Sequence, residues 1–431
     1  MAIDIRRNIT KKRNSSCSMP GVWRAVAYSK GAVVIFHSPK ACAHVTHSMD
    51  IGSSFRAKAR HQKIDKEIVP LVSSLLTEKH SIFGGEKQLM ECIAYVVNTY
   101  KPQYIVIAGS CVAGVIGDDI QSIATIAEEQ YKIPILAIQS SGFLDGEYYA
   151  GYVETALALI SRFMKKTQQS IENAVVLLGD QGGIHSEYVE EITRLLACFG
   201  IKVINQFPSY TNYEEMNKIP MAAFNVILGG SGSSDLHLQK IAEELKNKFG
   251  TPYLGDVYPI GWNNTRIWLH HLGVFLEKEE LAPKIIEQEA ALLFKVMERA
   301  RQKTIGKKVV LCIGRLNGYF RPQWIIELLT RLEITLLGAV VLTSYRSKDR
   351  QEVVKELKEC ADVEIYDEVS GEQIFKQADF ILTTHEINET KLRQLFLPLM
   401  PIPGVKGEVK MIEGIVRLLC RSSSRGGIVY G

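Results

Sequence analysis

The sequence predicts an α/β protein built on open, mostly parallel β-sheets. Short β-branched apolar runs alternate with longer amphipathic segments along nearly all of the 431 residues. The runs are almost continuously apolar and are bounded by Gly, Pro or Asp, as is typical of strands buried on both faces of a sheet. The segments 186–200 and 234–250 have helical periodicity, and both end on Gly after a charged turn, which is a signal that stops a helix. Repeated strand–helix units therefore predict parallel sheets with right-handed crossovers.

We predict ten buried strands in this alternation. In chain order they are 32–36, 104–109, 133–138, 173–179, 201–207, 224–230, 307–314, 337–344, 362–367 and 378–384.

Two polar, lysine-containing segments, 164–173 and 299–308, interrupt the alternation of strands and helices. Dividing the chain there predicts three domains, 1–165, 166–303 and 304–431. Each is long enough to hold a sheet of four or five strands around its own core.

Composition excludes several classes of protein. Hydrophobic residues make up 46% and charged residues 23%, which is ordinary for a soluble globular chain. The longest apolar run is far short of the roughly 18 residues that a membrane span needs, and the first residues contain no apolar core of a secretory signal. Lys and Arg exceed Asp and Glu by 51 − 47 = 4, which does not indicate nucleic-acid binding. We therefore expect a cytoplasmic protein with no membrane or nucleic-acid partner.

The eight cysteines fall into two groups by their surroundings. Five lie in predicted helices or strands, where a small buried hydrophobic residue is the better interpretation. These five are Cys92, Cys198, Cys312, Cys360 and Cys420.

The other three cysteines lie in predicted loops beside Gly or Pro. Cys42 follows the strand 32–36, Cys111 follows the strand 104–109, and Cys17 lies in SSCSMPG. Ligands bind at the carboxyl ends of strands in open α/β sheets, so a cofactor could reach thiolates placed there. The spacing matches no zinc knuckle or ferredoxin motif. Two interpretations stay open: an iron–sulfur site one ligand short of the usual four, or three unrelated loop cysteines.

Four segments, in order, resemble the component 1 superfamily of nitrogenase: HSPKACAH, LLTEKHSIFGGEKQL, GSCVAGVIGDDI and YPIGWNNTRIWL. This superfamily includes both subunits of the molybdenum–iron protein and the scaffold subunits on which its cofactor matures. It also includes dark-operative protochlorophyllide reductase, nickel-sirohydrochlorin reductive cyclase and methylthio-alkane reductase. The motifs run from Cys17 to about Leu269.

The resemblance implies three Rossmann-like domains and a complex of at least two such subunits, identical or paralogous, as a dimer or a two-fold tetramer. Cys17, Cys42 and Cys111 match the three cluster ligands of the family's first domain. Gly84 and Gly85 match its FGG turn, so the resemblance also implies that these two glycines help to bind the cofactor. The cluster it implies is either of the 4Fe–4S type or an eight-iron P-cluster shared between two subunits. A separate ATP-hydrolysing iron protein would supply the electrons. Asp118 and Asp119 match the GDD of the family motif.

One departure concerns the large cofactor of the catalytic nitrogenase subunit, which a cysteine of the second domain ligates. The corresponding segment here, FNVILGGSGSSDLHLQ, offers Ser231, Ser233 and Ser234 but no thiolate. Any second metallocofactor would therefore not be held by a thiolate of this chain. In lacking this cysteine and in carrying the segment YPIGWNNT, the chain resembles the β-type or scaffold-type subunits of the family.

Several other motifs have a structural and a functional interpretation. GGSGSSD could hold a phosphate or only begin a helix, and GDQGG (179–183) is most simply a turn between a strand and a helix. His37, His44 and His47 surround Cys42 in the sequence and could donate protons or simply be polar. Trp262 and Arg266 could line a substrate cavity or fill a domain interface. The basic N-terminal arm is most simply a solvated tail.

Three functions are consistent with these observations. The first is a subunit of a nitrogenase-like reductase that relays electrons from an ATP-dependent reductase to a substrate or second cofactor. The second is a scaffold on which a metallocluster is assembled. The third is a small-ligand binding protein whose loop cysteines are incidental.

Overall fold

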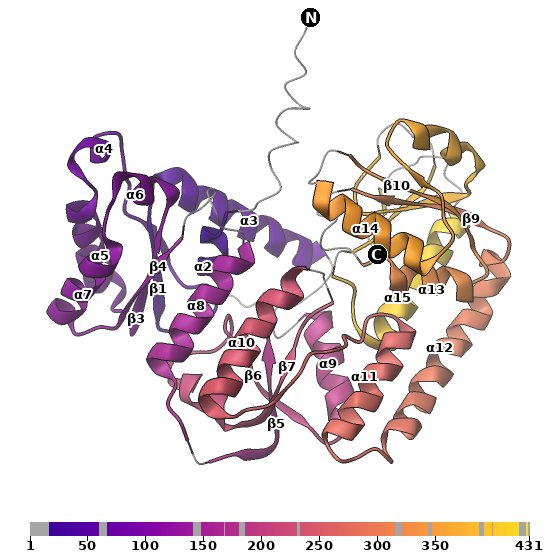
Figure 1. Ribbon diagram of the computed structural model, residues 1–431, viewed down its shortest axis with the longest axis horizontal. Helices are drawn as coiled ribbons and strands as arrows, with labels where there is room; N and C mark the ends of the chain where they lie inside the picture. The colour runs from indigo at the N-terminus through magenta and orange to yellow at the C-terminus, as the bar shows by residue number, and fades with distance from the viewer. Residues whose placement is uncertain are drawn as a thin grey trace, which may run out of the picture.

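The chain folds into a mixed α/β structure with three parallel sheets, which we describe from a computed structural model. The residues described are 17–59, 67–140, 148–167, 169–180, 186–230, 233–314, 321–343, 347–387, 392–398, 400–421 and 428–429. In Figure 1 the first sheet lies at the left, the third at the upper right, and the second between and below them. The predicted α/β fold class with parallel sheets is confirmed.

The first sheet has four parallel strands in the order β2-β1-β3-β4. They are β1 (Ala32–His37), β2 (Leu71–Ser73), β3 (Tyr104–Gly109) and β4 (Ile135–Gln139). Every residue of β1 and β3 is buried, because helices cover both faces of the sheet. The helices of this part of the chain are α2 (Met19–Arg24), α3 (Lys40–Ala59), α4 (His80–Phe83), α5 (Glu86–Tyr100), α6 (Cys111–Ile116), α7 (Ile120–Tyr131) and α8 (Tyr148–Phe163).

The second sheet also has four parallel strands, in the order β6-β5-β7-β8. They are β5 (Ile171–Leu178), β6 (Lys202–Phe207), β7 (Ala222–Ile227) and β8 (Tyr253–Leu254). Its helical elements are α9 (Glu187–Ala197), the 3₁₀ helix η1 (Tyr213–Met221), α10 (Ser233–Phe249), α11 (Trp262–Phe275) and α12 (Ala282–Thr304).

The third sheet has six parallel strands in the order β11-β10-β9-β12-β13-β14. They are β9 (Lys308–Ile313), β10 (Thr335–Val341), β11 (Ile365–Tyr366), β12 (Phe380–Thr383), β13 (Gln394–Phe396) and β14 (Ile428–Val429). Around it lie α13 (Gln323–Arg331), α14 (Ser347–Cys360), the 3₁₀ helix η3 (Ser370–Gln377) and α15 (Gly404–Cys420).

The second sheet packs against a different core on each face. Val175 and Leu177 of β5 belong to a core that extends into the third sheet, whereas Val176 and Leu178 belong to a core shared with the first sheet. Successive strand residues point to opposite faces, so β5 separates the two cores by alternation alone. The predicted domain limits at 165/166 and 303/304 stay predictions.

All ten predicted strands are present, and the four strands of the described residues that the sequence did not predict are two or three residues long. Two predictions about cysteines were wrong. Cys198 and Cys420 are exposed rather than buried; Cys198 is the C-cap residue of α9 and Cys420 is the last residue of α15. Cys92 and Cys312 are buried as predicted, and Cys360 is half-buried.

In the described part of the chain, no helix is both long and apolar enough to cross a membrane.

Candidate functional site

Three cysteines gather where strands of the first sheet end. β1 ends at His37 and Cys42 lies in the first turn of α3, while β3 ends at Gly109 and Cys111 is the first residue of α6. Cys17 lies just before α2. The sequence placed Cys42 and Cys111 in loops, and the structure corrects this: both lie in the opening turn of a helix. All three are half-buried and free of disulfides.

The Cys42 and Cys111 thiols lie close enough to Cys17 to raise its pKa. Burial raises the pKa of Cys17, and negative charge on Cys42 and Cys111 raises it further, while the Met19 backbone N–H opposes the shift. Burial also raises the pKa of Cys42, and a hydrogen bond with Ser38 opposes it. A bound cation would reverse this balance, because metal ligation deprotonates thiols and neutralises their mutual repulsion.

The donor set fits an iron–sulfur cluster. Thiolates are the usual ligands of such clusters, which commonly take four. Among the described residues, no group of three or more His, Cys, Asp or Glu side chains is arranged around a single metal ion. Three thiols from three separate chain segments could hold part of a multi-iron cluster, with a further ligand supplied from elsewhere.

A buried network connects the FGG turn to the GDD segment. Asp118 accepts a hydrogen bond from the Gly85 backbone N–H at 2.8 Å through Oδ1, and its Oδ2 lies 2.8 Å from His37 Nε2. His37 Nδ1 lies 2.9 Å from Ser74 Oγ. Because Ser74 Oγ accepts the Ser38 backbone N–H, its own hydroxyl hydrogen is free to point at His37 Nδ1. The neutral tautomer with a proton on Nε2 satisfies every partner.

Burial lowers the pKa of His37, although the hydrogen bond and charge of Asp118 act in the opposite direction. The imidazole is completely buried, so a proton-donating role toward Cys42 has no support in its contacts. His37 instead ties β1 to Asp118. His44 and His47 are exposed on α3.

The network also fixes the short helix that begins with Cys111. Ser110 caps α6 by accepting the Ala113 N–H at 3.2 Å, and the Asp118 N–H donates to the Ala113 carbonyl at 3.1 Å. Asp119 then caps α7 through the Gln121 and Ser122 N–H groups. The motif residues therefore hold α6, and with it Cys111, in a defined position.

Gly85 is required by the close approach of its neighbours. A Cβ there would lie 2.5 Å from Asp118 Oδ2, 2.6 Å from Leu76 Cδ2 and 3.0 Å from His37 Cε1. Gly84 has a φ of +76°, which a residue with a side chain rarely adopts. Gly84 and Gly85 thus build the turn that contacts Asp118, and their part in binding a cofactor stays a prediction.

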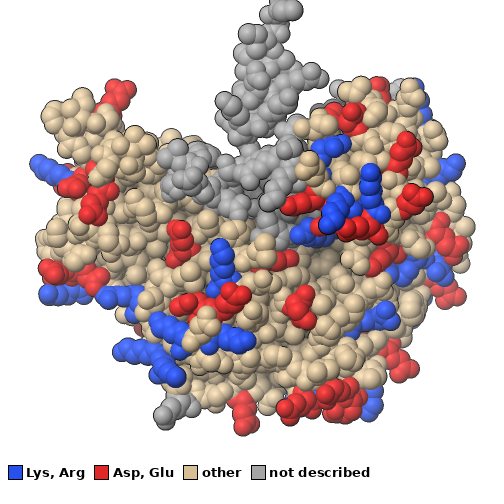
Figure 2. All heavy atoms as spheres, viewed as in Figure 1, with Lys and Arg blue, Asp and Glu red and all other residues tan. Residues whose placement is uncertain are grey.

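Exposed apolar side chains lie beside this turn. Ile82 and Phe83 of α4 are 78% and 84% exposed, and Val115 of α6 is 76% exposed. Contacts join α4 to α6, and Figure 1 shows the two helices together at the upper left corner. In Figure 2 this corner carries few charged side chains. Exposed apolar residues gathered next to a candidate site are typical of a protein–protein contact.

A second polar cluster, which the sequence did not predict, joins the first and second sheets. Arg24 Nε and Nη2 donate to the Asp180 carboxylate at 2.6 and 2.7 Å. The same guanidinium donates to the hydroxyls of Tyr28 and Tyr210, both at 3.0 Å, and Tyr148 donates to Asp180 at 3.1 Å. An arginine within an apolar helix gives no sequence signal for such a contact.

The remaining candidates are structural or lie outside the described residues. Trp262 is buried in the core, and the Arg266 guanidinium lies 5.9 Å from the centre of its ring. Residues 1–16, 181–185, 231 and 232 are not described, so the basic arm, most of GDQGG and Ser231 receive no structural account. The side chains of Ser233 and Ser234 are likewise outside the described part of the chain.

A profile described as "Nitrogenase component 1 type Oxidoreductase" matches residues 17–403. The chain belongs to this family. The match begins at Cys17 and contains the other two candidate ligands and both glycines of the FGG turn.

Curated relatives come from two kinds of component 1 protein. The chain is 28% identical over 328 residues to a nitrogenase iron-molybdenum cofactor biosynthesis protein NifE from Clostridium pasteurianum, covering 75% of this chain and 67% of that protein. It is 23% identical over 371 residues to a nitrogenase molybdenum-iron protein alpha chain from Methanosarcina barkeri, covering 84% and 66%. A NifE from the same organism is 24% identical over 297 residues, covering 66% and 60%. The matched region thus spans roughly two thirds of the length of these relatives.

The solved structure titled "Nitrogenase Cp1 at pH 5" superposes with a TM-score of 0.67 at 17% identity, covering 95% of this chain and 89% of that one. This likeness shows that the family's fold extends over nearly the whole chain.

Proposed function

We propose that Cys17, Cys42 and Cys111 hold an iron–sulfur cluster and that the chain is an electron-relaying subunit of a nitrogenase-like complex. The observation that carries this proposal is the meeting of three thiols, from three separate segments, at one edge of the first sheet. When bound, the cluster would supply one-electron transfer. Its nuclearity would be that of a 4Fe–4S or an eight-iron P-cluster type.

The chain's own residues would position and tune this cluster. The Met19 N–H and the Ser38 side chain act on the sulfurs of Cys17 and Cys42, and hydrogen bonds to ligating sulfur raise a cluster's reduction potential. The His37–Asp118–Gly85 network would hold α6, so that Cys111 is presented in a fixed position.

A second component-1-like subunit, identical or paralogous, would complete the site in a dimer or tetramer. Three thiols leave the cluster short of ligands, and a partner covering Ile82, Phe83 and Val115 would bring its own residues close to α6. A separate ATP-dependent iron protein would deliver the electrons. A second metallocofactor would be held without a thiolate from the loop between β7 and α10.

A scaffold for metallocluster assembly is the second candidate. Relatives named cofactor biosynthesis protein NifE favour it, and so does the absence of cysteine from the segment 224–239. In this role the complex would hold a second cluster temporarily and pass it on.

Anaerobic purification followed by iron and sulfide analysis tests the cluster. Cys17→Ala, Cys42→Ala and Cys111→Ala should each lose most of the bound iron, because each removes a thiolate ligand. Cys198→Ala and Cys420→Ala are matched controls, because both thiols are exposed and lie far along the chain from the site. Equal iron in all five variants would contradict the assignment.

Two assays of the assembled complex separate the two roles. Substrate reduction that requires the reductase and ATP supports the relay. Transfer of a metallocluster to an acceptor protein, without substrate turnover, supports the scaffold.

A further inference from the structure

A buried carboxyl group lies on the helix that carries Cys42. Asp50 of α3 is 7% exposed. Cys42, Thr46 and Asp50 are spaced four residues apart and therefore share one face of the helix. Thr46 is buried and Cys42 is half-buried, so this is the inner face. Eight residues at about 1.5 Å each place Asp50 about 12 Å along the helix from the candidate ligand.

The group nearest to Asp50 belongs to α2, the helix that follows Cys17. Arg24, the last residue of α2, places Nη1 3.8 Å from Asp50 Oδ1, which is beyond hydrogen-bonding distance. The same guanidinium binds Asp180 through Nε and Nη2, at 2.6 and 2.7 Å. One arginine thus faces two carboxylates, and Asp180 is the one that it holds by two hydrogen bonds.

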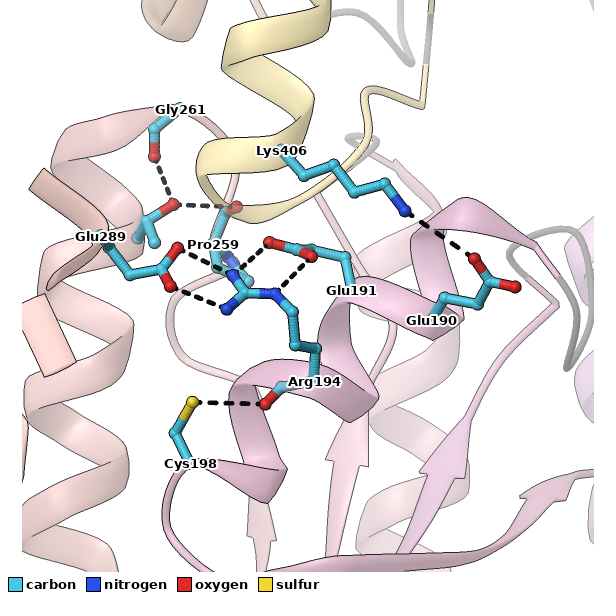
Figure 3. Close-up of polar contacts among 9 residues, drawn as sticks. Glu190, Glu191, Arg194, Cys198, Pro259, Gly261, Glu289 and Lys406 are labelled. Atoms are coloured by element: carbon cyan, nitrogen blue, oxygen red, sulfur yellow. Dashed lines mark hydrogen bonds and ion pairs between the residues drawn. The ribbon is translucent and has the colours of Figure 1, made fainter. Parts of the chain in front are cut away.

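A second arginine of the chain shows the fully bonded alternative. Arg194 donates two hydrogen bonds to Glu191 and two to Glu289, and both carboxylates are buried (Figure 3). Hydrogen bonds of this kind stabilise the ionised form of a carboxyl group. Asp50 also shares its arginine with a second acid but has no hydrogen bond from it, so its ionised form is stabilised less.

The charges around Asp50 favour protonation of this carboxyl group. Burial raises the pKa of Asp50 and the negative charge of Asp180 raises it further, whereas Arg24 and His47 oppose the shift. Asp50 also acts on the Tyr28 hydroxyl, whose pKa burial raises, so that this hydroxyl stays protonated. Asp50 therefore takes up a proton more readily than an aspartate at the surface does.

Solvent protons have a short path to this carboxyl group. His47 is exposed and lies three residues before Asp50 on α3, within one helical turn. A histidine can accept and release protons near neutral pH. The sequence suggested proton donation by His47, and its place beside Asp50 gives that role a recipient.

An electron added at the cysteines would attract a proton to Asp50. Two unit charges about 12 Å apart, at an effective dielectric constant of about 20, interact strongly enough to raise the proton affinity about tenfold. By linkage, protonation of Asp50 makes the electron easier to accept by the same factor.

We propose that Asp50 takes up one proton from solvent when one electron enters the cluster held by Cys17, Cys42 and Cys111. The inference rests on the proposed function, because it requires that cluster. The electron comes from the iron-protein reductase, or from dithionite in the test. The proton forms one O–H bond on the Asp50 carboxylate and no other bond breaks, and the proton leaves again when the electron passes on.

The pH dependence of the cluster's reduction potential tests the proposal. In the anaerobic, cluster-loaded complex the potential should rise as the pH is lowered from 8 to 5.5. The rise should be at most about 59 mV, which corresponds to a tenfold difference in proton affinity for one electron. Asp50→Asn should have the same potential at both pH values. Glu91→Gln removes an exposed carboxylate of α5 and should keep the rise, because solvent and salt screen an exposed charge.

Infrared difference spectra give a readout that needs no variant. The reduced-minus-oxidised spectrum of the parent should contain the band of a protonated carboxylic acid, and Asp50→Asn should lack it. A parent spectrum without this band, equal potentials at both pH values, or a rise that persists in Asp50→Asn would overturn the role of Asp50 and leave the cluster in place. A parent complex without a redox-active cluster would overturn the proposed function and this inference with it.

Discussion

Gly85→Ala tests the network that holds the helix of Cys111. A Cβ at position 85 would lie 2.5 Å from Asp118 Oδ2 and 2.6 Å from Leu76 Cδ2, well inside ordinary contact distances. Overpacking of this kind typically costs about 1–3 kcal/mol. Asp118 would also have to move away from the Gly85 N–H and from His37, and a weakened hydrogen bond to a buried charge costs a further ~1.5–3 kcal/mol.

The two contributions predict a loss of about 2.5–6 kcal/mol in the free energy of unfolding. For a domain of 150–250 residues, each kcal/mol moves the thermal midpoint by about 2–4 °C. We therefore expect circular dichroism to show a midpoint about 5–24 °C lower. Bound iron should fall as well, because α6 would no longer be held in place.

Gly114→Ala is the matched control, because Gly114 lies within α6 and a Cβ there would meet nothing within 4 Å. Alanine is favoured over glycine inside a helix by about 1 kcal/mol, so this midpoint should stay level or rise by a few degrees. Equal midpoints and equal iron in Gly85→Ala and the parent protein would refute the role given to the FGG turn.

Three further substitutions test other parts of the structure. His37→Gln should remove a pH dependence of stability. The pKa of His37 is lowered in the folded protein, so the parent protein should lose stability as the pH falls below 6.5. Urea titrations should therefore show that the stability of the variant relative to the parent is higher at pH 5.5 than at pH 7.5. Arg24→Leu leaves the Asp180 carboxylate buried without its counter-charge and should cost ~3–5 kcal/mol in the same titrations; a loss below 1 kcal/mol would show that the pair does not join the sheets. Gly404→Ala adds a Cβ 2.5 Å from Glu191 Oε1, whereas Gly200→Ala has open space around the Cβ, and both positions have a positive φ. Gly404→Ala should therefore lower the thermal midpoint more than Gly200→Ala. Equal decreases would show that backbone strain, and not the contact with Glu191, causes the loss.

Local patterns predicted most of the fold. A strand buried on both faces is a short apolar run between turn residues, and β1, β3 and β9 follow that pattern without exception over their central residues. The four missed strands are only two or three residues long, which is too short to show a pattern, and each pairs with a neighbouring parallel strand. Cys198 and Cys420 were misjudged because both lie at the ends of their helices, where helical periodicity no longer determines which side chains are buried.

The candidate site could be predicted only in part. Strand ends placed Cys42 and Cys111 at one edge of the first sheet, because parallel strands bring their carboxyl ends together. The resemblance singled out Gly85 and Asp118 but gave no reason for them, and the reason is a contact between residues 33 positions apart. The Arg24–Asp180 pair spans 156 positions. Such contacts depend on tertiary structure and leave no periodic signal in the sequence.

The iron content of the anaerobic protein tests the central claim most directly. The account predicts protein-bound iron and acid-labile sulfide in the parent chain within its complex, and in Cys198→Ala. It predicts loss of both from Cys17→Ala, Cys42→Ala and Cys111→Ala. A parent complex without iron, or iron retained in full by all three variants, would contradict the claim that these thiols hold a cluster.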